Sequence, residues 1–255
     1  MKAVIVTKHG GPDNLEIQEL PTPSPGPGEV CIRVSKAGIN FADILSRMGL
    51  YPGAPKPPFT PGMEVSGTIH ELGPDIDNFK VGDYVCVHRG WQSFIVAPGS
   101  DKQLFKADPN IVPLSTYLGT VGMPGRTAYF GLQRVGKPKP GETVVVSAAS
   151  GAGGTVVGQM AKILGCRAVG VAGGETKCSY VTEELGFDAC VDYKAGNLEA
   201  DLKAACPDGI DIYFENVGAE VSKAVANNLN SGARIPICGF IAHYNSTDME
   251  KEETP

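Results

Sequence analysis

The sequence predicts an α/β protein of two domains, in which a compact all-β domain precedes a doubly wound parallel sheet. Three observations support this fold class. The chain has 255 residues, which is enough for two domains of ordinary size. Short β-type runs and turns fill residues 1–118, whereas β-type and helical segments alternate from residue 119 onward. A glycine-rich turn joins the first β-type run of the second part to its first helix.

The first part is expected to be the all-β domain, over residues 1–118. Its β-type runs come at short intervals and are separated by turn sequences such as PSPGPGE and PGAPKPP. One short helix is expected in FADILSRMG, residues 41–49. The expected strands are residues 2–7, 29–39, 64–73, 83–88 and 91–97.

The second part, residues 119–245, is expected to hold the parallel sheet, and residues 246–255 read as a polar, acidic tail. Alternation of strands and helices predicts βαβ units with right-handed crossovers. Gly165 and Gly186 each follow a helical run, at the position where a left-handed residue closes a helix. The expected strands are 143–149, 168–173, 189–193, 210–216 and 234–240, and the expected helices are 154–165, 175–186, 196–206 and 219–230.

Composition narrows the class of function. The formal net charge is −6 and no run of basic residues occurs, which argues against a nucleic-acid or anionic-membrane partner. No apolar stretch approaches the ~18 residues of a membrane span, and the N-terminus does not resemble a signal peptide. The seven cysteines are scattered without CxxC spacing, as is typical of reduced thiols. These features favour a soluble cytoplasmic protein without a disulfide or zinc framework.

The glycine turn lies in VVVSAASGAGGTVVGQ, residues 144–159. A turn that ends a strand and opens a helix places backbone N–H groups and the helix dipole where they hold a pyrophosphate. The GxGxxG spacing is not met, because Val156 stands at its third glycine; the glycines come instead at Gly151, Gly154 and Gly158. The alternatives are a tight corner without a ligand and, for Gly158, a close approach of the helix to the sheet.

The end of the next strand favours NADPH over NADH. Enzymes that use NAD carry an acidic residue there for the ribose hydroxyl. This chain has Gly173 and Gly174 at the strand end, with Glu175 later and Lys177 beyond it. Small residues followed by a lysine accept a 2′-phosphate, although a solvated lysine at a helix start is the alternative.

Longer motifs resemble the zinc-free medium-chain dehydrogenases and reductases over nearly all of residues 1–245. AGINFADILSRMGLYPGAPKPPFTPGMEVSGTI and VGDYV resemble the quinone-reductase branch. LGTVGMPGRTAYFGL, AASGAGG, GFDACVDYK, FENVGAEV and ICGFIAHYN resemble the prostaglandin, alkenal and curcumin reductase branch. The resemblance implies a GroES-like domain over residues 1–118 and a Rossmann domain over residues 119–245, with NADPH and a small-molecule substrate bound between them.

The resemblance also implies site residues. Catalytic roles fall to Asn40, Tyr51 and Tyr244, and Asp43 would line the substrate side, with helix capping as its alternative role. Cofactor contacts are implied for Met123, Thr127, Gly151, Gly154, Gly158, Gly173, Lys177, Tyr193, Asn216, Cys238, Gly239 and Asn245.

No metal site is expected. Zinc needs about four suitable ligands at tetrahedral geometry. Where zinc alcohol dehydrogenases carry a cysteine and a histidine, this chain has Asn40 and Met63, and Asp43 and Glu64 alone cannot complete such a site. Without a Lewis acid, hydride addition to a conjugated carbon is favoured over ketone reduction, because hydrogen bonds can stabilise the resulting enolate. The expected activity is therefore NADPH-dependent reduction of the double bond of α,β-unsaturated ketones and aldehydes.

Two alternatives stay open. The first half of the chain suggests an NADPH:quinone oxidoreductase. Departures from the family pattern at Arg126, Gly153 and Ala219 suggest an NADPH-binding protein with little or no catalysis. The chain also stops at Pro255, where the superfamily continues with a further strand and a segment of the catalytic domain. This shortening is expected to leave residues 234–240 as an apolar sheet edge. A homo-oligomer that covers the edge is expected, and the alternatives are an unstable fragment and a rearranged fold that closes the gap.

Overall fold

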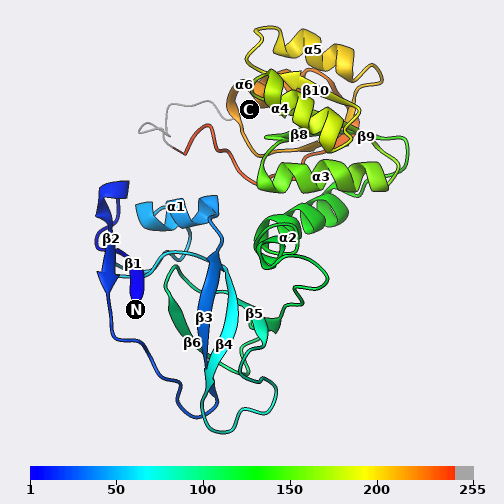
Figure 1. Ribbon diagram of the computed structural model, residues 1–255. Coiled ribbons are helices and arrows are strands. Elements are labelled where there is room, and N and C mark those ends of the chain that lie inside the picture. The colour runs from blue at the N-terminus through cyan, green and yellow to red at the C-terminus, as the bar shows by residue number, and fades with distance from the viewer. Residues whose placement is uncertain (245–255) are drawn as a thin grey trace. The chain divides into compact units, whose positions relative to one another are not determined.

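The computed structural model describes residues 1–244 and divides the chain into two compact units, Met1–Met123 and Pro124–Pro255 (Figure 1). The division lies after Met123, whereas the sequence places the boundary after residue 118. Each unit has its own sheet, so the two are described separately.

The first unit is built on a five-stranded antiparallel sheet with the order β6-β3-β4-β5-β7. Apolar side chains of β3 and β6 face one core, as the register pairs Val30 with Ala97 and Ile32 with Ile95, and all four are buried. The strands are β3 (Glu29–Ala37), β4 (Val65–Leu72), β5 (Tyr84–Val87), β6 (Phe94–Pro98) and β7 (Phe105–Lys106), and β1 (Lys2–Val6) pairs with β2 (Leu15–Glu19) as a separate two-stranded sheet. The expected β domain is confirmed, although the sequence missed β2 and β7.

Helix α1 (Phe41–Met48) in the first unit confirms the helix expected at residues 41–49. It ends at Gly49, which has a φ of 79° and closes the helix in the left-handed conformation. Short 3₁₀ turns occupy Pro12–Asn14 and Leu114–Leu118.

The second unit holds a five-stranded parallel sheet with the order β10-β9-β8-β11-β12. The order reverses between β8 and β11, and such a switch point is where doubly wound sheets bind ligands. The strands are β8 (Thr143–Ser147), β9 (Arg167–Ala172), β10 (Ala189–Asp192), β11 (Ile210–Phe214) and β12 (Leu229–Arg234). The helices are α2 (Met123–Phe130), which starts at the last residue of the first unit, α3 (Ala152–Ile163), α4 (Glu175–Ser179), α5 (Leu198–Ala205) and α6 (Ala219–Ala226), with π-helical turns at Gly131–Gly136 and Tyr180–Glu184.

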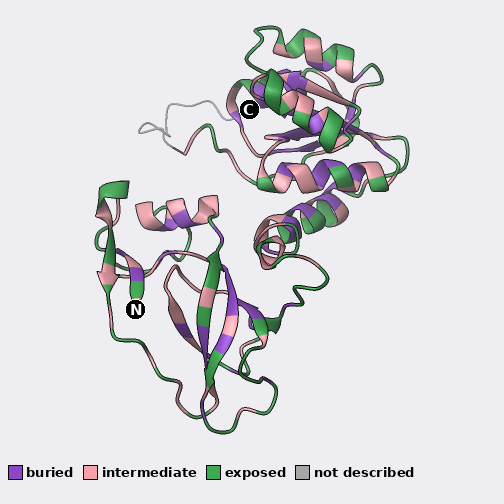
Figure 2. Cartoon of the chain, in the orientation of Figure 1, coloured by how far each residue is buried: buried purple, intermediate pink, exposed green. Residues whose placement is uncertain are grey.

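Two apolar layers cover this parallel sheet. On one face Val144 and Val146 of β8 pack with residues of α3, and on the other Val145 packs with residues of α5 and α6. Figure 2 shows the strands largely buried and the outer helix surfaces exposed. Because both faces are covered, β8 reads as a continuous apolar run rather than an alternating one. The expected doubly wound sheet is confirmed.

The last strand differs from expectation. The sequence predicts a helix at 219–230 and a strand at 234–240, but α6 ends at Ala226 and β12 covers Leu229–Arg234. Over residues 235–244, the described part of the chain after β12, the only β pairing is an isolated bridge between Glu215 and Ile237. Pro236 has no N–H group to donate to a ladder, so a regular strand cannot continue through it. Gly165 and Gly186 have φ values of 77° and 72°, which confirms their predicted role as helix ends.

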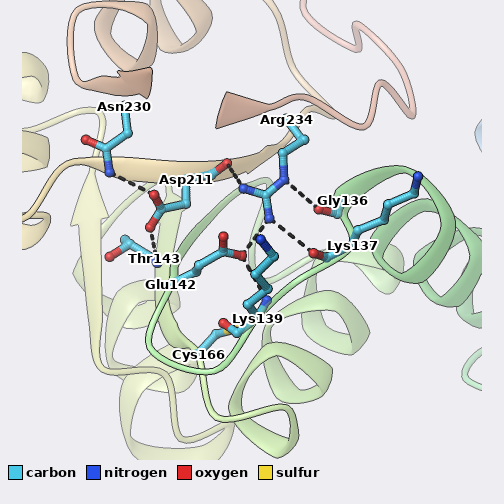
Figure 3. Close-up of polar contacts among 9 residues, drawn as sticks. All are labelled: Gly136, Lys137, Lys139, Glu142, Thr143, Cys166, Asp211, Asn230 and Arg234. Carbon is cyan, nitrogen blue, oxygen red and sulfur yellow. Dashed lines mark hydrogen bonds and ion pairs between the residues drawn. The ribbon is translucent and has the colours of Figure 1, made fainter. Parts of the chain in front are cut away.

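A polar cluster fixes β12 at the edge of this sheet (Figure 3). The Arg234 guanidinium donates to the carbonyls of Gly136 and Lys137 at 2.9 and 3.2 Å, and to the Glu142 carboxylate at 2.5 Å. Asp211 of β11 accepts from Thr143 N–H at 2.9 Å and thereby joins β11 to β8. This cluster lies where β8 begins, at the end of the strand away from the glycine turn.

Candidate functional site

The turn after β8 exposes the start of a helix. Ala148 has a φ of 50°, and the N–H of Gly151 donates to its carbonyl at 2.8 Å. Gly151 is the N-cap of α3, and no side chain caps this helix. The first-turn N–H groups of α3 therefore lie beside the carboxyl end of β8 without a side-chain acceptor.

Two glycines of the turn serve different purposes. A Cβ on Gly154 would lie 2.3 Å from the carbonyl oxygen of Ala148, so only glycine lets the helix start so close to the turn. A Cβ on Gly158 would lie 1.7 Å from the ring of Phe187, which is buried. Gly158 is itself buried inside α3, so packing on Phe187 accounts for this glycine, in line with the alternative of a close approach of the helix to its surroundings. Its contact with a pyrophosphate stays a prediction.

The carboxyl ends of β9 and β10 bring Gly173 and Tyr193 together. A Cβ on Gly173 would lie 2.7 Å from the Tyr193 ring, so the ring covers this glycine closely. Gly174 has a φ of 95°, and its N–H donates to the Asp192 carboxylate at 2.8 Å. Lys177 is exposed on α4. The sequence did not single out Asp192, whose pKa is lowered by the hydrogen bonds from the N–H groups of Gly174 and Lys194.

Asn216 lies at the switch point, directly after β11. Its side-chain amide donates to the carbonyl of Ser147 at 2.7 Å, and its backbone N–H donates to the Ser147 hydroxyl at 2.8 Å. These bonds tie the carboxyl end of β11 to that of β8. Asn216 and the glycine turn are thus brought to the same edge of the sheet.

Glu215 is a buried carboxylate that sequence reasoning missed. It is 2% exposed and accepts hydrogen bonds from the Tyr213 hydroxyl at 2.9 Å and from the Val217 N–H at 2.7 Å, and also from Ser222. Burial and the neighbouring Glu215 raise the pKa of the Tyr213 hydroxyl. The carboxylate organises the backbone after β11. In the sequence, the position of Glu215 within the FENVG motif was the feature that could have identified it as a site residue.

The segment after β12 returns to Glu215. The N–H of Cys238 donates to the Glu215 carbonyl at 2.8 Å, and Cys238 is exposed. The Tyr244 hydroxyl accepts from the Phe240 N–H at 3.0 Å and lies over Gly239, where a Cβ would be 2.5 Å from it. Asn245, to which a cofactor contact was assigned, lies outside the described residues.

In the first unit, the Glu64 carboxylate links two of the expected residues, Asn40 and Met123. Glu64 is 5% exposed and accepts from the Asn40 side-chain amide at 3.1 Å and from the Met123 N–H at 2.9 Å. Asp43 accepts from the Asn40 backbone N–H at 2.7 Å, which is the helix-capping role weighed for it. Burial raises the pKa of Asp43 to about 6, against the effect of that hydrogen bond and with a smaller contribution from Glu64.

Tyr51 and Asp43 line a pocket of about 200 Å³ in the first unit, together with Met63 and His88. Thr127 is exposed on α2, on the second unit. Among residues 1–244, no three His, Cys, Asp or Glu side chains lie together in a group that could hold a metal ion. No helix in the described part of the chain is long and apolar enough to cross a bilayer.

Comparison with known proteins gives consistent matches. Residues 26–128 match the family described as alcohol dehydrogenase GroES-like domain, and residues 152–252 match that described as zinc-binding dehydrogenase. The chain is 42% identical over 244 residues to the NADPH-dependent curcumin reductase of Escherichia coli, covering 94% of this chain and 70% of the relative. It is 47% identical over 188 residues to prostaglandin reductase 1 of Oryctolagus cuniculus, covering 73% and 53%.

A solved structure agrees with these matches. The crystal structure of CurA in complex with NADPH from Vibrio vulnificus is 35% identical in sequence and superimposes with a TM-score of 0.86, over 100% of this chain and 76% of that one.

Proposed function

The chain belongs to the medium-chain dehydrogenase/reductase superfamily, and we propose that within it the protein is an NADPH-dependent reductase of activated carbon–carbon double bonds. The observation that carries the proposal is 42% identity over 94% of this chain to an NADPH-dependent curcumin reductase. Curcumin and prostaglandin reductases are both named among its relatives, and their identities exceed 40%.

The second unit fits the cofactor. The uncapped start of α3 offers N–H groups to a pyrophosphate, and Gly151 and Gly154 let it approach the backbone. Asn216, fixed by Ser147, borders the same edge of the sheet. We assign the adenosine 2′-phosphate to Lys177 and Tyr193, because the residues that directly follow β9 are Gly173 and Gly174. The Asp192 carboxylate beside them already accepts hydrogen bonds from the N–H groups of Gly174 and Lys194. NADPH would supply a hydride to the substrate when bound.

This chain's own residues would bind the substrate and stabilise charge. Asn40 carries a side-chain amide, and Tyr51 and Tyr244 each carry a phenol. Hydrogen-bond donors of these kinds stabilise the negatively charged oxygen of an enolate. The Asn40 amide is oriented by Glu64, so its position is fixed before a substrate arrives. We infer that these three residues carry the substrate contacts.

A substrate panel tests the function. NADPH oxidation would be followed with an α,β-unsaturated ketone, an alkenal, a quinone and the saturated ketone, with NADH in a parallel series. We expect turnover of the enone and alkenal with NADPH, and none of the saturated ketone. Preferential turnover of quinones would establish the quinone reductase alternative. Stabilisation by NADPH without turnover of any compound would establish the noncatalytic alternative, since binding at 100 times the Kd adds about 2.7 kcal/mol to the free energy of unfolding.

A homo-oligomer and a cytoplasmic location also belong to the proposal. Ile235 and Ile237 after β12 are 42% and 64% exposed, which supports burial of this edge against a second copy. Light scattering on the purified protein would give its mass in solution, and a monomer at micromolar concentration would contradict the oligomer. The scattered free cysteines support a reducing compartment. Fluorescence microscopy of a tagged chain would test the location.

A further inference from the structure

Two thiols that the proposed chemistry does not use face each other in the second unit. Cys178 lies on α4 and Cys190 on β10, and their sulfur atoms are 2.9 Å apart. Both cysteines are free and partly buried. Two thiols at this distance can react with each other, because the oxidised form of one sulfur lies within reach of the other sulfur and can be converted into a disulfide.

The two sulfurs are close to bonding distance. A disulfide bond is about 2.05 Å long, so the sulfurs need to approach by roughly 0.9 Å. Helix α4 continues into the π-helical turn Tyr180–Glu184, which Val181 anchors in the core, whereas Glu175, Thr176 and Lys177 at its start are exposed. The approach of about 0.9 Å is therefore expected at the exposed start of α4 and in the Cys178 side chain. Cys190 belongs to a strand of the parallel sheet and packs against the apolar layer under α3, which holds it in place.

We propose that Cys178 and Cys190 form an oxidation site, at which a hydroperoxide converts the two thiols into a disulfide. In the first step the Cys178 sulfur attacks the peroxide, the O–O bond breaks, and a sulfenic acid and an alcohol (or water) are formed. In the second step the Cys190 sulfur attacks the sulfenic sulfur, an S–S bond forms, and water leaves with the thiol proton. Overall, two thiols are oxidised and one peroxide is reduced to an alcohol and a water molecule.

The order of the two steps follows from the surroundings. Burial, and then the neighbouring Cys178 and Asp192, raise the pKa of the Cys190 thiol, which keeps it protonated and makes it a poor first nucleophile. Cys178 is partly buried as well, but it directly follows Glu175, Thr176 and Lys177, which are exposed, and an oxidant is expected to reach it from this surface. Cys178 therefore meets the oxidant and Cys190 resolves the sulfenic acid.

The consequence for NADPH rests on the proposed function. Lys177 directly precedes Cys178, and Asp192 and Tyr193 follow Cys190 within three residues. A bond between the two sulfurs draws α4 toward β10 and moves Lys177 relative to Tyr193. Since we assign these residues to the 2′-phosphate, the oxidised protein is expected to bind NADPH about tenfold more weakly, with little change for NADH.

The chemistry can be tested by peptide mass. Trypsin cleaves after Lys177 and Lys194, so one peptide, residues 178–194, carries both cysteines. The full chain with Cys238→Ser, which removes the exposed thiol, would be treated with hydrogen peroxide, unfolded, alkylated and digested. We expect this peptide to lose roughly 2 Da and to resist alkylation, and dithiothreitol to reverse both changes. Cleavage at Glu183 and Glu184 would leave two halves joined by the disulfide.

Matched variants assign the roles. Cys190→Ser is expected to leave a sulfenic acid on Cys178 that dimedone captures, whereas Cys178→Ser is expected to leave Cys190 unmodified. Both variants would be checked for native circular dichroism. Two alkylated thiols in the peptide of the peroxide-treated chain, or irreversible over-oxidation of Cys178 without a link, would overturn the proposal.

Binding separates this inference from the proposed function. Titration of the reduced and oxidised chains with NADPH and with NADH gives both affinities. Absence of NADPH binding by the reduced chain would refute the cofactor assignment without contradicting the proposal that Cys178 and Cys190 form a disulfide. A disulfide that forms without changing the NADPH affinity would refute the link to Lys177.

Discussion

Replacement of Gly158 by alanine tests whether packing, and not a ligand, requires the glycine inside α3. The new Cβ would lie 1.7 Å from the ring of Phe187, whereas apolar carbon atoms are normally about 3.5–4.0 Å apart. The ring, 4% exposed within the layer that includes Val157 and Ala161, would have to move by roughly 2 Å.

The expected loss follows from two opposing effects. Overpacking of this size costs about 3 kcal/mol, at the upper end of the usual range, because the ring is enclosed. Alanine gains about 1 kcal/mol over glycine in a helix interior. The free energy of unfolding should therefore fall by about 2 kcal/mol, which lowers the Tm by roughly 4–8 °C in a chain of this size.

Urea and thermal unfolding of purified variants would measure this loss. Gly153→Ala is the matched control, because Gly153 also lies in α3 and a Cβ there meets no atom within 4 Å, so its free energy of unfolding should equal that of the parent or exceed it by up to about 1 kcal/mol. Adding Phe187→Leu to Gly158→Ala should give a coupling energy of at least about 1 kcal/mol. A Gly158→Ala variant as stable as the parent chain would refute the packing explanation.

Three further predictions concern the edge cluster, the buried acid and the cofactor pocket. Arg234→Met should lower the free energy of unfolding by about 2–3 kcal/mol in urea, because the Glu142 carboxylate and two carbonyls lose their donor. Because the pKa of Asp43 is raised, the folded state keeps a proton on this carboxyl at pH values where the unfolded state has lost it. The contribution of the protonated Asp43 to the free energy of unfolding is therefore full below pH 3.8 and is lost as the pH rises through about 6. Asp43→Asn should remove that fall, and urea curves across this range should show a difference on the order of 1 kcal/mol. Lys177→Ala should weaken NADPH binding about tenfold in titrations and leave NADH binding unchanged.

Each of these has a result that would contradict it. Equal stabilities of Arg234→Met and of a surface control, Lys203→Met, would show that the cluster does not hold β12. Parallel pH profiles of the parent and of Asp43→Asn would mean that this carboxyl titrates normally. Equal weakening of NADPH binding and NADH binding by Lys177→Ala would show that this lysine does not bind the 2′-phosphate.

The parallel sheet was largely predictable from sequence, because each strand is a short apolar run followed by a helical segment with a glycine at its end. Val144, Val145 and Val146 are buried on both faces of the sheet, so the run itself identifies β8. β12 was misplaced for the same physical reason. Its sequence LNSGAR is polar at an exposed edge, whereas the apolar run that follows it contains Pro236 and pairs at only one residue.

The site was predictable where local chain geometry decides it. The uncapped start of α3 and the need for glycine at Gly154 follow from a strand, a turn and a helix in succession. Tertiary contacts decided the rest. Gly158 faces Phe187, which is 29 positions away (187 − 158), and no local pattern announces that contact. Likewise, Asn216 is fixed by two hydrogen bonds that it donates to Ser147 on another strand.

Transfer of a labelled hydride tests the proposed reaction most directly. The protein would be supplied with NADPH carrying deuterium at the transferable position of its nicotinamide ring, together with an α,β-unsaturated ketone, and the product would be analysed by NMR. Hydride addition to the conjugated carbon predicts deuterium at the β-carbon of a saturated ketone whose carbonyl is intact. Deuterium at the carbonyl carbon of an alcohol, or no labelled product while NADPH is bound, would contradict it.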